Sequence, residues 1–292
     1  MTLLSLLTAV VSGALKLTHV IRSESRDGVF AVTSLGNEVF VLRMASQQVV
    51  VYDANTFTLQ RYIAVPGLGE MIALAACAHY KCLYVALSQH QSIYRAELSG
   101  SSAVKKWSVA SSPAGLSVNK KHNVVVACWA ARKIREYTTH GALVREVSLA
   151  GVDPWHAVQL STGDYVVSEC RSKSPGAVSV VGIDGQVVRR YCPSPSSDLG
   201  EMSPGGLAVT KNDDILVADA ENKRILLVNS SLSSARELAL PVDDGIKEPW
   251  SLCLDESRGR LYVGECAEGE GCSFQCLTVF DYDTELTMDT GI

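Results

Sequence analysis

The sequence lacks several features that would assign it quickly to a class. No hydrophobic run in its 292 residues is long enough to span a bilayer as a helix. It has no C-x-x-C motif, no zinc-spaced Cys/His pairs and no sustained heptad pattern. A phosphate-binding glycine loop and a nucleophile elbow are also missing. These absences argue against a membrane span, a zinc finger, a coiled coil and the common nucleotide-binding and serine-hydrolase sites.

Positive charge is in deficit. There are 26 Lys and Arg against 31 Asp and Glu, for a net charge of −5, so the whole chain has no general attraction to nucleic acid or anionic membrane. The charge is uneven, because residues 101–150 carry eight basic side chains against two acidic ones, and residues 241–292 carry three against twelve. Hydrophobic residues make up 47%, which is enough for a large buried core and excludes a disordered chain.

Short apolar runs separated by turn residues are what the sequence does contain. Residues 203–240 hold four such runs, at 206–210, 215–218, 224–228 and 235–240. Runs of Val, Leu and Ile bounded by Asn, Asp, Ser and Lys are typical of short strands joined by turns. One sheet of this size buries too little area to offset its ordering entropy, so it needs similar units beside it.

The second of these runs recurs along the chain. Its six copies begin at Val39, Leu83, Val124, Tyr165, Ile215 and Leu261, in steps of 44, 41, 41, 50 and 46 residues. The runs before and after each copy repeat as well, for example GVFAVTS with QVVVYD and WSLCLD with LTVFD. This spacing is expected for one blade per repeat. The sequence therefore predicts an all-β fold, a six-bladed β-propeller with four-stranded antiparallel blades.

The last blade needs a fourth strand from elsewhere. Its own candidate, ELTMD at residues 285–289, is a poor strand sequence. An N-terminal strand within Ala14 to Arg22 would complete the blade and remove an open sheet edge. We therefore expect the N-terminal strand to close the ring, with the C-terminal tail as the alternative.

One blade carries a recognisable motif. Pro204-x-Gly206-Leu207-Ala208-Val209, followed by ILVAD with Asp219, then Asn222 and Arg224, resembles the NHL repeat of six-bladed propellers. The resemblance extends from about Val29 to Asp281. The first three blades replace the three polar residues by Arg43, Ser46 and Gln48, by Leu87, His90 and Ser92, and by Cys128, Ala131 and Lys133. In the family these polar positions tie down a loop within one blade, so the resemblance implies blade geometry and no chemistry.

The resemblance also implies a class of function. The chain is similar to the NHL domain of tripartite-motif ubiquitin ligases, where this propeller selects substrates. The RING, B-box and coiled-coil parts of those proteins do not occur in this sequence. The resemblance thus implies a protein- or peptide-binding scaffold, including a substrate reader of a ubiquitin-ligase-like system. We expect no enzyme activity and no cofactor, because no converging set of catalytic residues or metal ligands is visible in the sequence.

The N-terminus leaves two interpretations open. Residues 1–13 are apolar and end in small residues, which is typical of a secretory signal peptide, but the usual basic start is missing. The alternative is an apolar flap packed on the propeller. Residues 14–292 are then a single NHL-type propeller domain, which we expect to be a monomer. The protein is secreted under the first interpretation and cytoplasmic under the second.

The redox state of the nine cysteines depends on whether the protein is secreted or cytoplasmic. Most are isolated in apolar runs, where cysteine behaves as a small buried hydrophobe. Cys77 and Cys82 flank a turn and could face each other across a hairpin, and Cys266, Cys272 and Cys276 cluster in the last blade. Secretion would favour one disulfide in each group. A zinc site is not predicted, because no His lies nearby to complete the ligands.

Catalysis and RNA binding are the two alternatives to a scaffold. Propeller enzymes of the lactonase and amidating-lyase type place metal ligands or acid–base groups at the inner blade ends, and there this sequence has only Glu70 and His156 as ionisable residues. Some NHL propellers bind single-stranded RNA. The basic residues of the third blade, which include Lys120 and Lys121, are predicted to be spread over several surfaces and not to converge on one nucleic-acid site.

The predicted binding surface is one rim of the disk. Loops after the second strand of a blade and loops leading into its first strand share this rim, and three of the four Trp fall in them. Trp and Arg dominate interface energetics, so these residues form an aromatic and cationic set suited to a protein or peptide ligand. The set comprises Trp129, Arg132, Lys133, Trp155, His156 and Trp250.

Overall fold

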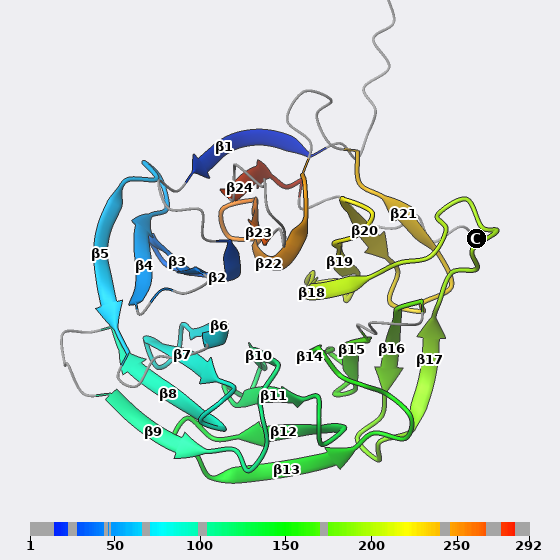
Figure 1. Cartoon of the computed structure of the whole chain (residues 1–292), viewed down its shortest axis with the longest axis horizontal. Coiled ribbons are helices and arrows are strands. Elements are labelled where there is room, and N and C mark those ends of the chain that lie inside the picture. The colour runs from blue at the N-terminus through cyan, green and yellow to red at the C-terminus, as the bar shows by residue number, and fades with distance from the viewer. Residues whose placement is uncertain are drawn as a thin grey trace, which may run out of the picture.

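A computed structural model describes the chain from residue 15 to residue 283 with several gaps. The described residues are 15–22, 28–43, 46, 48–65, 71–98, 104–169, 175–239, 246–266 and 276–283. The predicted signal peptide or flap at residues 1–13, the tail at 285–289, and Glu70 lie outside them. Six separate four-stranded antiparallel sheets stand around a central axis (Figure 1). The predicted six-bladed β-propeller is confirmed.

Each of the first five blades is formed by four consecutive strands, and the first of them lies nearest the axis (Figure 1). Blade 1 comprises β2 (Val29–Leu35), β3 (Glu38–Arg43), β4 (Gln48–Asp53) and β5 (Leu59–Ala64). Blade 2 comprises β6 (Met71–Cys77), β7 (Cys82–Leu87), β8 (Ser92–Glu97) and β9 (Val104–Ser108). Blade 3 comprises β10 (Gly115–Val118), β11 (Val124–Cys128), β12 (Lys133–Tyr137) and β13 (Leu143–Ser148).

Blades 4 and 5 follow the same order. Blade 4 comprises β14 (His156–Gln159), β15 (Tyr165–Glu169), β16 (Ala177–Val181) and β17 (Val187–Tyr191). Blade 5 comprises β18 (Pro204–Val209), β19 (Ile215–Asp219), β20 (Arg224–Val228) and β21 (Ala235–Glu237). In blade 5 the first three strands match the predicted runs closely, and β21 is shorter than the predicted 235–240.

Blade 6 is built from both ends of the chain. It comprises β22 (Pro249–Asp255), β23 (Arg260–Glu265), β24 (Cys276–Asp281) and the N-terminal β1 (Lys16–Arg22). β1 is antiparallel to β24, with Lys16 opposite Asp281 and Arg22 opposite Cys276. The outer edge of blade 6 is therefore paired by the first strand of the chain, and this pairing joins the two ends of the ring.

The hydrophobic core lies between the blades. Six clusters of buried apolar side chains are present, and each joins one blade to its neighbour, including blade 6 to blade 1. The second strands are deeply buried, since every residue of β7, β11, β15 and β19 is buried. A blade has two apolar faces, so the ring stabilises each blade only when neighbours cover both of them.

The NHL motif of blade 5 forms a network of hydrogen bonds at the end of β19. Asp219 is fully buried and accepts hydrogen bonds from Nδ2 of Asn222 at 2.9 Å and from Nε of Arg224 at 2.8 Å. Its Oδ1 also accepts the backbone N–H of Ser203 at 2.8 Å. These contacts fix the turn after β19 against the segment that enters β18, which is the loop-fixing geometry that the resemblance implied.

The two rims of the disk follow from the antiparallel order of the strands. We call one rim the upper rim; it carries the turns between second and third strands and the segments that enter the innermost strands, and it includes residues 129–132, 149–155, 220–223 and 246–248. The lower rim carries the turns after the innermost strands, at residues 119–123, 160–164, 210–214 and 255–259. The described residues include no helix of the length and apolarity needed to cross a membrane.

Candidate binding site at the channel mouth

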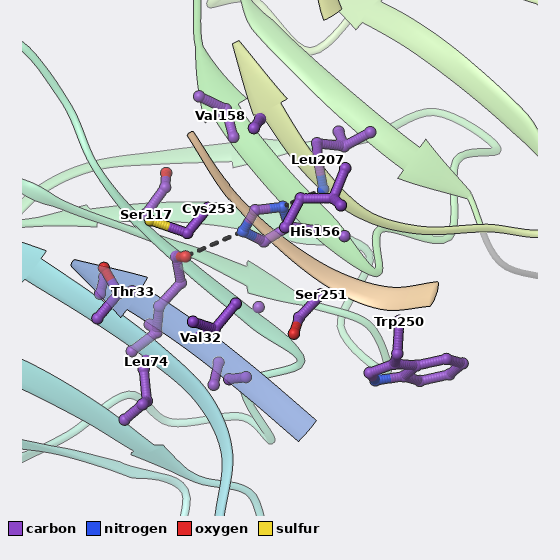
Figure 2. Close-up of a pocket in the computed structure, with 18 of the residues that line it drawn as sticks. Val32, Thr33, Leu74, Ser117, His156, Val158, Leu207, Trp250, Ser251 and Cys253 are labelled. Atoms are coloured by element: carbon purple, nitrogen blue, oxygen red, sulfur yellow. Dashed lines mark hydrogen bonds between the residues drawn. The ribbon is translucent and has the colours of Figure 1, made fainter. Parts of the chain in front are cut away.

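The innermost strands enclose a cavity of about 220 Å³ on the propeller axis. Its wall is mainly apolar and comes from all six blades, with Val32, Leu74, Leu116, Val158, Leu207 and Leu252 among the lining residues (Figure 2). The polar side chains on the wall include Thr33, Ser117 and Ser251. The cavity wall is therefore mainly apolar, with a few hydroxyl groups and the imidazole of His156.

His156 is held by backbone groups of the two blades that flank its own. Its Nε2 lies 2.9 Å from the carbonyl oxygen of Leu116 on β10, and its Nδ1 lies 3.1 Å from the backbone nitrogen of Leu207 on β18. The dashed lines in Figure 2 mark bonds of this ring. Since Leu207 N–H must donate, Nδ1 is the acceptor and Nε2 carries the proton. Burial lowers the pKa of His156, which favours this neutral form.

This geometry differs from the cationic rim role that the sequence suggested for His156. Both ring nitrogens already have backbone partners, and the neutral tautomer satisfies both contacts. The residue therefore acts as a pin that joins blades 3, 4 and 5 beneath the rim. The cationic part of the predicted set is reduced to Arg132 and Lys133.

A close approach of two innermost strands makes this pin possible. A Cβ on Gly115 of β10 would lie 2.6 Å from the carbonyl oxygen of Trp155 and 2.7 Å from Cδ2 of His156. Both distances are shorter than real Cβ contacts allow, so only glycine fits. Gly115 thereby lets the start of β14 come close enough for His156 to reach Leu116.

Three aromatic rings gather at the upper mouth of the channel. The ring of Trp250 lies 5.2 Å from that of Trp155 at an interplanar angle of 74°, and 6.1 Å from that of Phe30 at 78°. All three residues line the axial cavity, although they come from blades 6, 4 and 1. Edge-to-face pairs at such distances are favourable. Trp155 and Trp250 thus contact each other at the mouth, and their rings are only partly buried.

A second cavity of about 310 Å³ opens beside Trp250 on the upper rim. We call it the rim pocket; it lies between blades 5 and 6, and Phe30 reaches it from blade 1. Its lining residues are Phe30, Ser203, Ala220, Glu221, Lys223, Glu248, Trp250 and Cys266. The pocket therefore combines two aromatic rings with two carboxylates and one ammonium group.

Trp129 lies apart from this cluster and is the most exposed of the upper-rim tryptophans. Its side chain belongs to the turn after β11 and is 52% exposed, and it makes no ring contact with any described residue. Arg132, in the same turn, forms an ion pair with Asp153 at 2.6 Å. Lys133 forms an ion pair with Glu146. The two predicted cations therefore already have carboxylate partners.

On the lower rim, polar groups connect neighbouring blades. Ser161 N–H donates to Asp213 at 3.0 Å, Lys211 N–H donates to Glu256 at 2.9 Å, and Nε of Arg258 donates to the carbonyl of Gly36 at 3.0 Å. Between blades 2 and 3, the rings of His79 and His122 stack at 4.2 Å. Most of the polar side chains named here connect the turns of neighbouring blades. Lys120 and Lys121 precede His122 in the turn that contacts His79.

The described residues contain no group of three or more His, Cys, Asp and Glu side chains that could hold a metal ion. They therefore add no support to the alternative of a metal-dependent enzyme. Cysteines 77, 82, 128, 192, 253 and 276 are free thiols. Cys77 and Cys82 are cross-strand neighbours, as the sequence predicted. Burial raises the pKa of Cys253 to about 11 and that of Cys276 to about 11, which holds both in the less reactive thiol form.

Sequence reasoning found the two channel-mouth tryptophans but missed Phe30, Glu221 and Glu248. Phe30 lies one residue inside an apolar run, where a core position was the natural interpretation. The two glutamates lie in different blades, and their separation along the chain gives no sign that they share a pocket. Their positions relative to the predicted strands could have placed them on one rim. Glu221 follows the second strand of blade 5, and Glu248 precedes the innermost strand of blade 6.

Comparison with known proteins defines the class. Residues 202–226 match the family model of the NHL repeat. The fold is similar to that of virginiamycin B lyase from Staphylococcus aureus in complex with quinupristin, with 14% identity over 86% of this chain and 82% of that chain and a TM-score of 0.63. It is also similar to Kuenenia stuttgartiensis hydrazine synthase, at 18% identity, 84% and 75% coverage and a TM-score of 0.62.

A WD40 propeller domain is equally similar. The WD40 propeller domain of Doa1 matches with 14% identity over 94% of this chain and 99% of that chain and a TM-score of 0.62. No curated protein matches the sequence. At these identities the structural likeness shows the fold alone. The protein is a six-bladed β-propeller, and it carries an NHL repeat in its fifth blade.

Proposed function

We propose that this propeller is a non-enzymatic scaffold that binds a protein or peptide on its upper rim. The supporting observation is the side chain of Trp129, which is 52% exposed on the same rim as Trp155 and Trp250. Tryptophan is among the residues most enriched at the energetic centres of protein interfaces. Arg132 and Lys133 follow it in the chain, and their side chains form ion pairs with Asp153 and Glu146.

The ligand would cross from the turn of blade 3 toward the channel mouth. Trp129 offers the outer anchor, and the Trp155–Trp250 pair with Phe30 offers a second aromatic contact near the axis. His156 supports this floor from below, since it fixes blade 4 to its neighbours. The fold is also similar to the WD40 propeller domain of Doa1, which supports the proposal only at the level of the fold.

A pair of double variants tests this proposal. Trp129→Ala with Arg132→Ala removes the exposed anchor and its flanking cation, whereas Lys120→Ala with Lys121→Ala removes two exposed residues of the lower rim. Peptides are first selected on the wild type from a random peptide library, and their retention is then compared on both variants. We expect the first variant to lose retention and the second to keep it, with both still folded.

Equal retention by the two variants would refute the assignment of the rim. Because Trp129 is half exposed, its replacement by Ala should lower the free energy of unfolding by no more than about 2 kcal/mol, less than for a fully buried tryptophan. A much larger loss would assign Trp129 to the core of blade 3 instead.

RNA binding is the second candidate, and one observation favours it. The stacked pair of His79 and His122 lies on the lower rim in the same turns as Lys81, Lys120 and Lys121. Aromatic rings beside basic side chains are suited to stacking bases and contacting phosphates. Loss of short single-stranded RNA by the Lys120/Lys121 variant, with a steep dependence on salt, would favour this function over the upper-rim scaffold.

A further inference from the structure

We infer that the rim pocket binds a positively charged lysine or arginine side chain of the partner peptide. This inference rests on the proposed function and assigns a charge preference to it. The pocket is lined by Glu221 and Glu248, by Lys223 and by the rings of Phe30 and Trp250. Carboxylates beside aromatic faces are the combination that recognises an organic cation.

The carboxylates of the pocket are available to a ligand. Among the described residues, neither Glu221 nor Glu248 forms an ion pair or donates or accepts through its carboxylate. This is a contrast with the acidic residues around them, since Asp219 is bonded to Arg224 and Glu265 to Thr278 and Cys276. The pocket thus holds two unpaired acids against one ammonium group, that of Lys223.

The aromatic wall is available as well. Trp250 is only partly buried, and it contacts Phe30 and Trp155 in edge-to-face geometry. In an edge-to-face pair one ring presents its edge, so the faces of the cluster are not all covered by stacking. A guanidinium or ammonium group over an indole face is attracted by the ring quadrupole, most strongly for Trp.

The opposite side of the upper rim lacks this preference. Arg132 and Lys133 are paired with Asp153 and Glu146, so they contribute less unbalanced charge. A peptide lying from Trp129 to the channel mouth would therefore meet paired charges in blade 3 and two unpaired carboxylates at the rim pocket. The volume of about 310 Å³ is ample for one long side chain.

A charge cycle tests the inference. Peptides are selected from a random library on the wild type, and the enriched sequences are resynthesised with arginine replaced by citrulline and lysine by norleucine, which removes the charge and largely keeps the shape. Affinity is measured for each pair on the wild type and on Glu221→Gln with Glu248→Gln. On the wild type, loss of the ligand charge should weaken binding about tenfold. On the double variant the same loss should change affinity less than about twofold.

A matched control excludes a general effect of net charge. Asp198→Asn with Glu237→Gln removes the same two charges outside the pocket, from two exposed residues. This variant should keep the tenfold preference. An equal preference in the pocket variant would overturn the inference.

The failure of this inference differs from the failure of the proposed function. If the selected peptides lack basic residues yet are lost on the Trp129/Arg132 variant, the upper rim binds peptide and the charge preference is wrong. If no peptide is retained by the wild type, or retention survives in the Trp129/Arg132 variant, the proposed function fails and this inference with it.

Discussion

The Nδ1 of His156 accepts the backbone N–H of Leu207 at 3.1 Å, across the boundary between blades 4 and 5. The other nitrogen of the ring lies 2.9 Å from the carbonyl oxygen of Leu116 in blade 3. One neutral side chain therefore satisfies a buried donor and a buried acceptor on two different neighbours. The apolar clusters between the blades have no directional preference, whereas this histidine adds directional hydrogen bonds at the floor of the channel mouth.

Replacement of His156 should destabilise the ring. In His156→Leu, the N–H of Leu207 and the carbonyl of Leu116 lose their partner, and an unsatisfied buried group costs about 1–3 kcal/mol. Two groups lose their partner, and small shifts of the surrounding chain recover part of the loss. We therefore expect the free energy of unfolding, measured in urea, to fall by roughly 2–4 kcal/mol. Ser117→Ala is the control, since it removes one bond to the carbonyl of Ala157 at the same boundary of blades 3 and 4. A loss no larger than that of the control would contradict the role of the pin.

The same histidine predicts a dependence of stability on pH. Burial lowers its pKa in the folded protein below the ordinary value of 6.5, so below that pH the unfolded chain binds the proton first. The free energy of unfolding of the wild type should therefore fall as pH drops below 6.5, by up to about 1.4 kcal/mol per pH unit. The curve of His156→Leu should be flatter in this range, and parallel curves would show that the folded ring takes up the proton freely.

Glu136 should stabilise the boundary of blades 3 and 4 in a lower range of pH. Burial would raise the pKa of this carboxyl, but hydrogen bonds from Asn123, Asn119 and Tyr165 outweigh it and lower the pKa below 4.5. The contribution is therefore present above pH 4.5 and is lost as the pH falls toward the folded pKa. Glu136→Gln should unfold more easily by about 2 kcal/mol near neutral pH, and its difference from the wild type should shrink in acid.

The exposed Glu237→Gln serves as the control for this measurement. Its side chain is 51% exposed, and its ion pair with Arg224 is long, at 3.8 Å. An exposed ion pair of this kind contributes little to stability, so the replacement should have little effect at any pH. Urea unfolding of the three proteins across this range of pH decides the matter. A constant difference between Glu136→Gln and the wild type would mean that the carboxylate is not the stabilising species.

The cysteines should differ in reactivity. Cys192 is exposed, whereas burial raises the pKa of Cys253 and of Cys276 to about 11. At about pH 8 only a small fraction of a thiol with so high a pKa is thiolate, and the thiolate is the species that reacts. Brief alkylation of the native protein followed by peptide mapping should therefore label Cys192 well ahead of Cys253 and Cys276. Equal labelling of all three cysteines in the brief reaction would contradict this order. It would show that the strands that carry Cys253 and Cys276 open readily.

Much of the fold could be predicted from the sequence because its signal is local. The run ILVAD and its copies specify the second strands, and the turns between them limit each blade to short strands. The link between His156 and Leu207 could not be predicted, because it depends on how closely two innermost strands approach. Gly115 was the only sign of that approach, and a glycine in an apolar run has several meanings.

The candidate site was predicted in part for the same reason. Trp155 directly precedes the innermost strand of blade 4 and Trp250 lies at the start of that of blade 6, so their common rim follows from topology. Their contact at 5.2 Å does not, because blade 5 lies between their blades in sequence. Arg132 and Lys133 were identified as rim cations, yet their pairing with Asp153 and Glu146 depends on side-chain positions that no periodic pattern encodes.

The indole N–H signals of the four tryptophans offer the most direct test of the binding surface. Trp107 is an internal control, since its ring contacts Tyr84 and Tyr137 in the core and its Nε1 is buried. Protein labelled with ¹⁵N in its tryptophans is titrated with a peptide selected on the wild type, and each signal is assigned by Trp→Phe replacement. Binding on the upper rim predicts shifts of Trp129, Trp155 and Trp250 with Trp107 unchanged. A shift confined to Trp107, or saturation by peptide with the three rim signals unmoved, would contradict it.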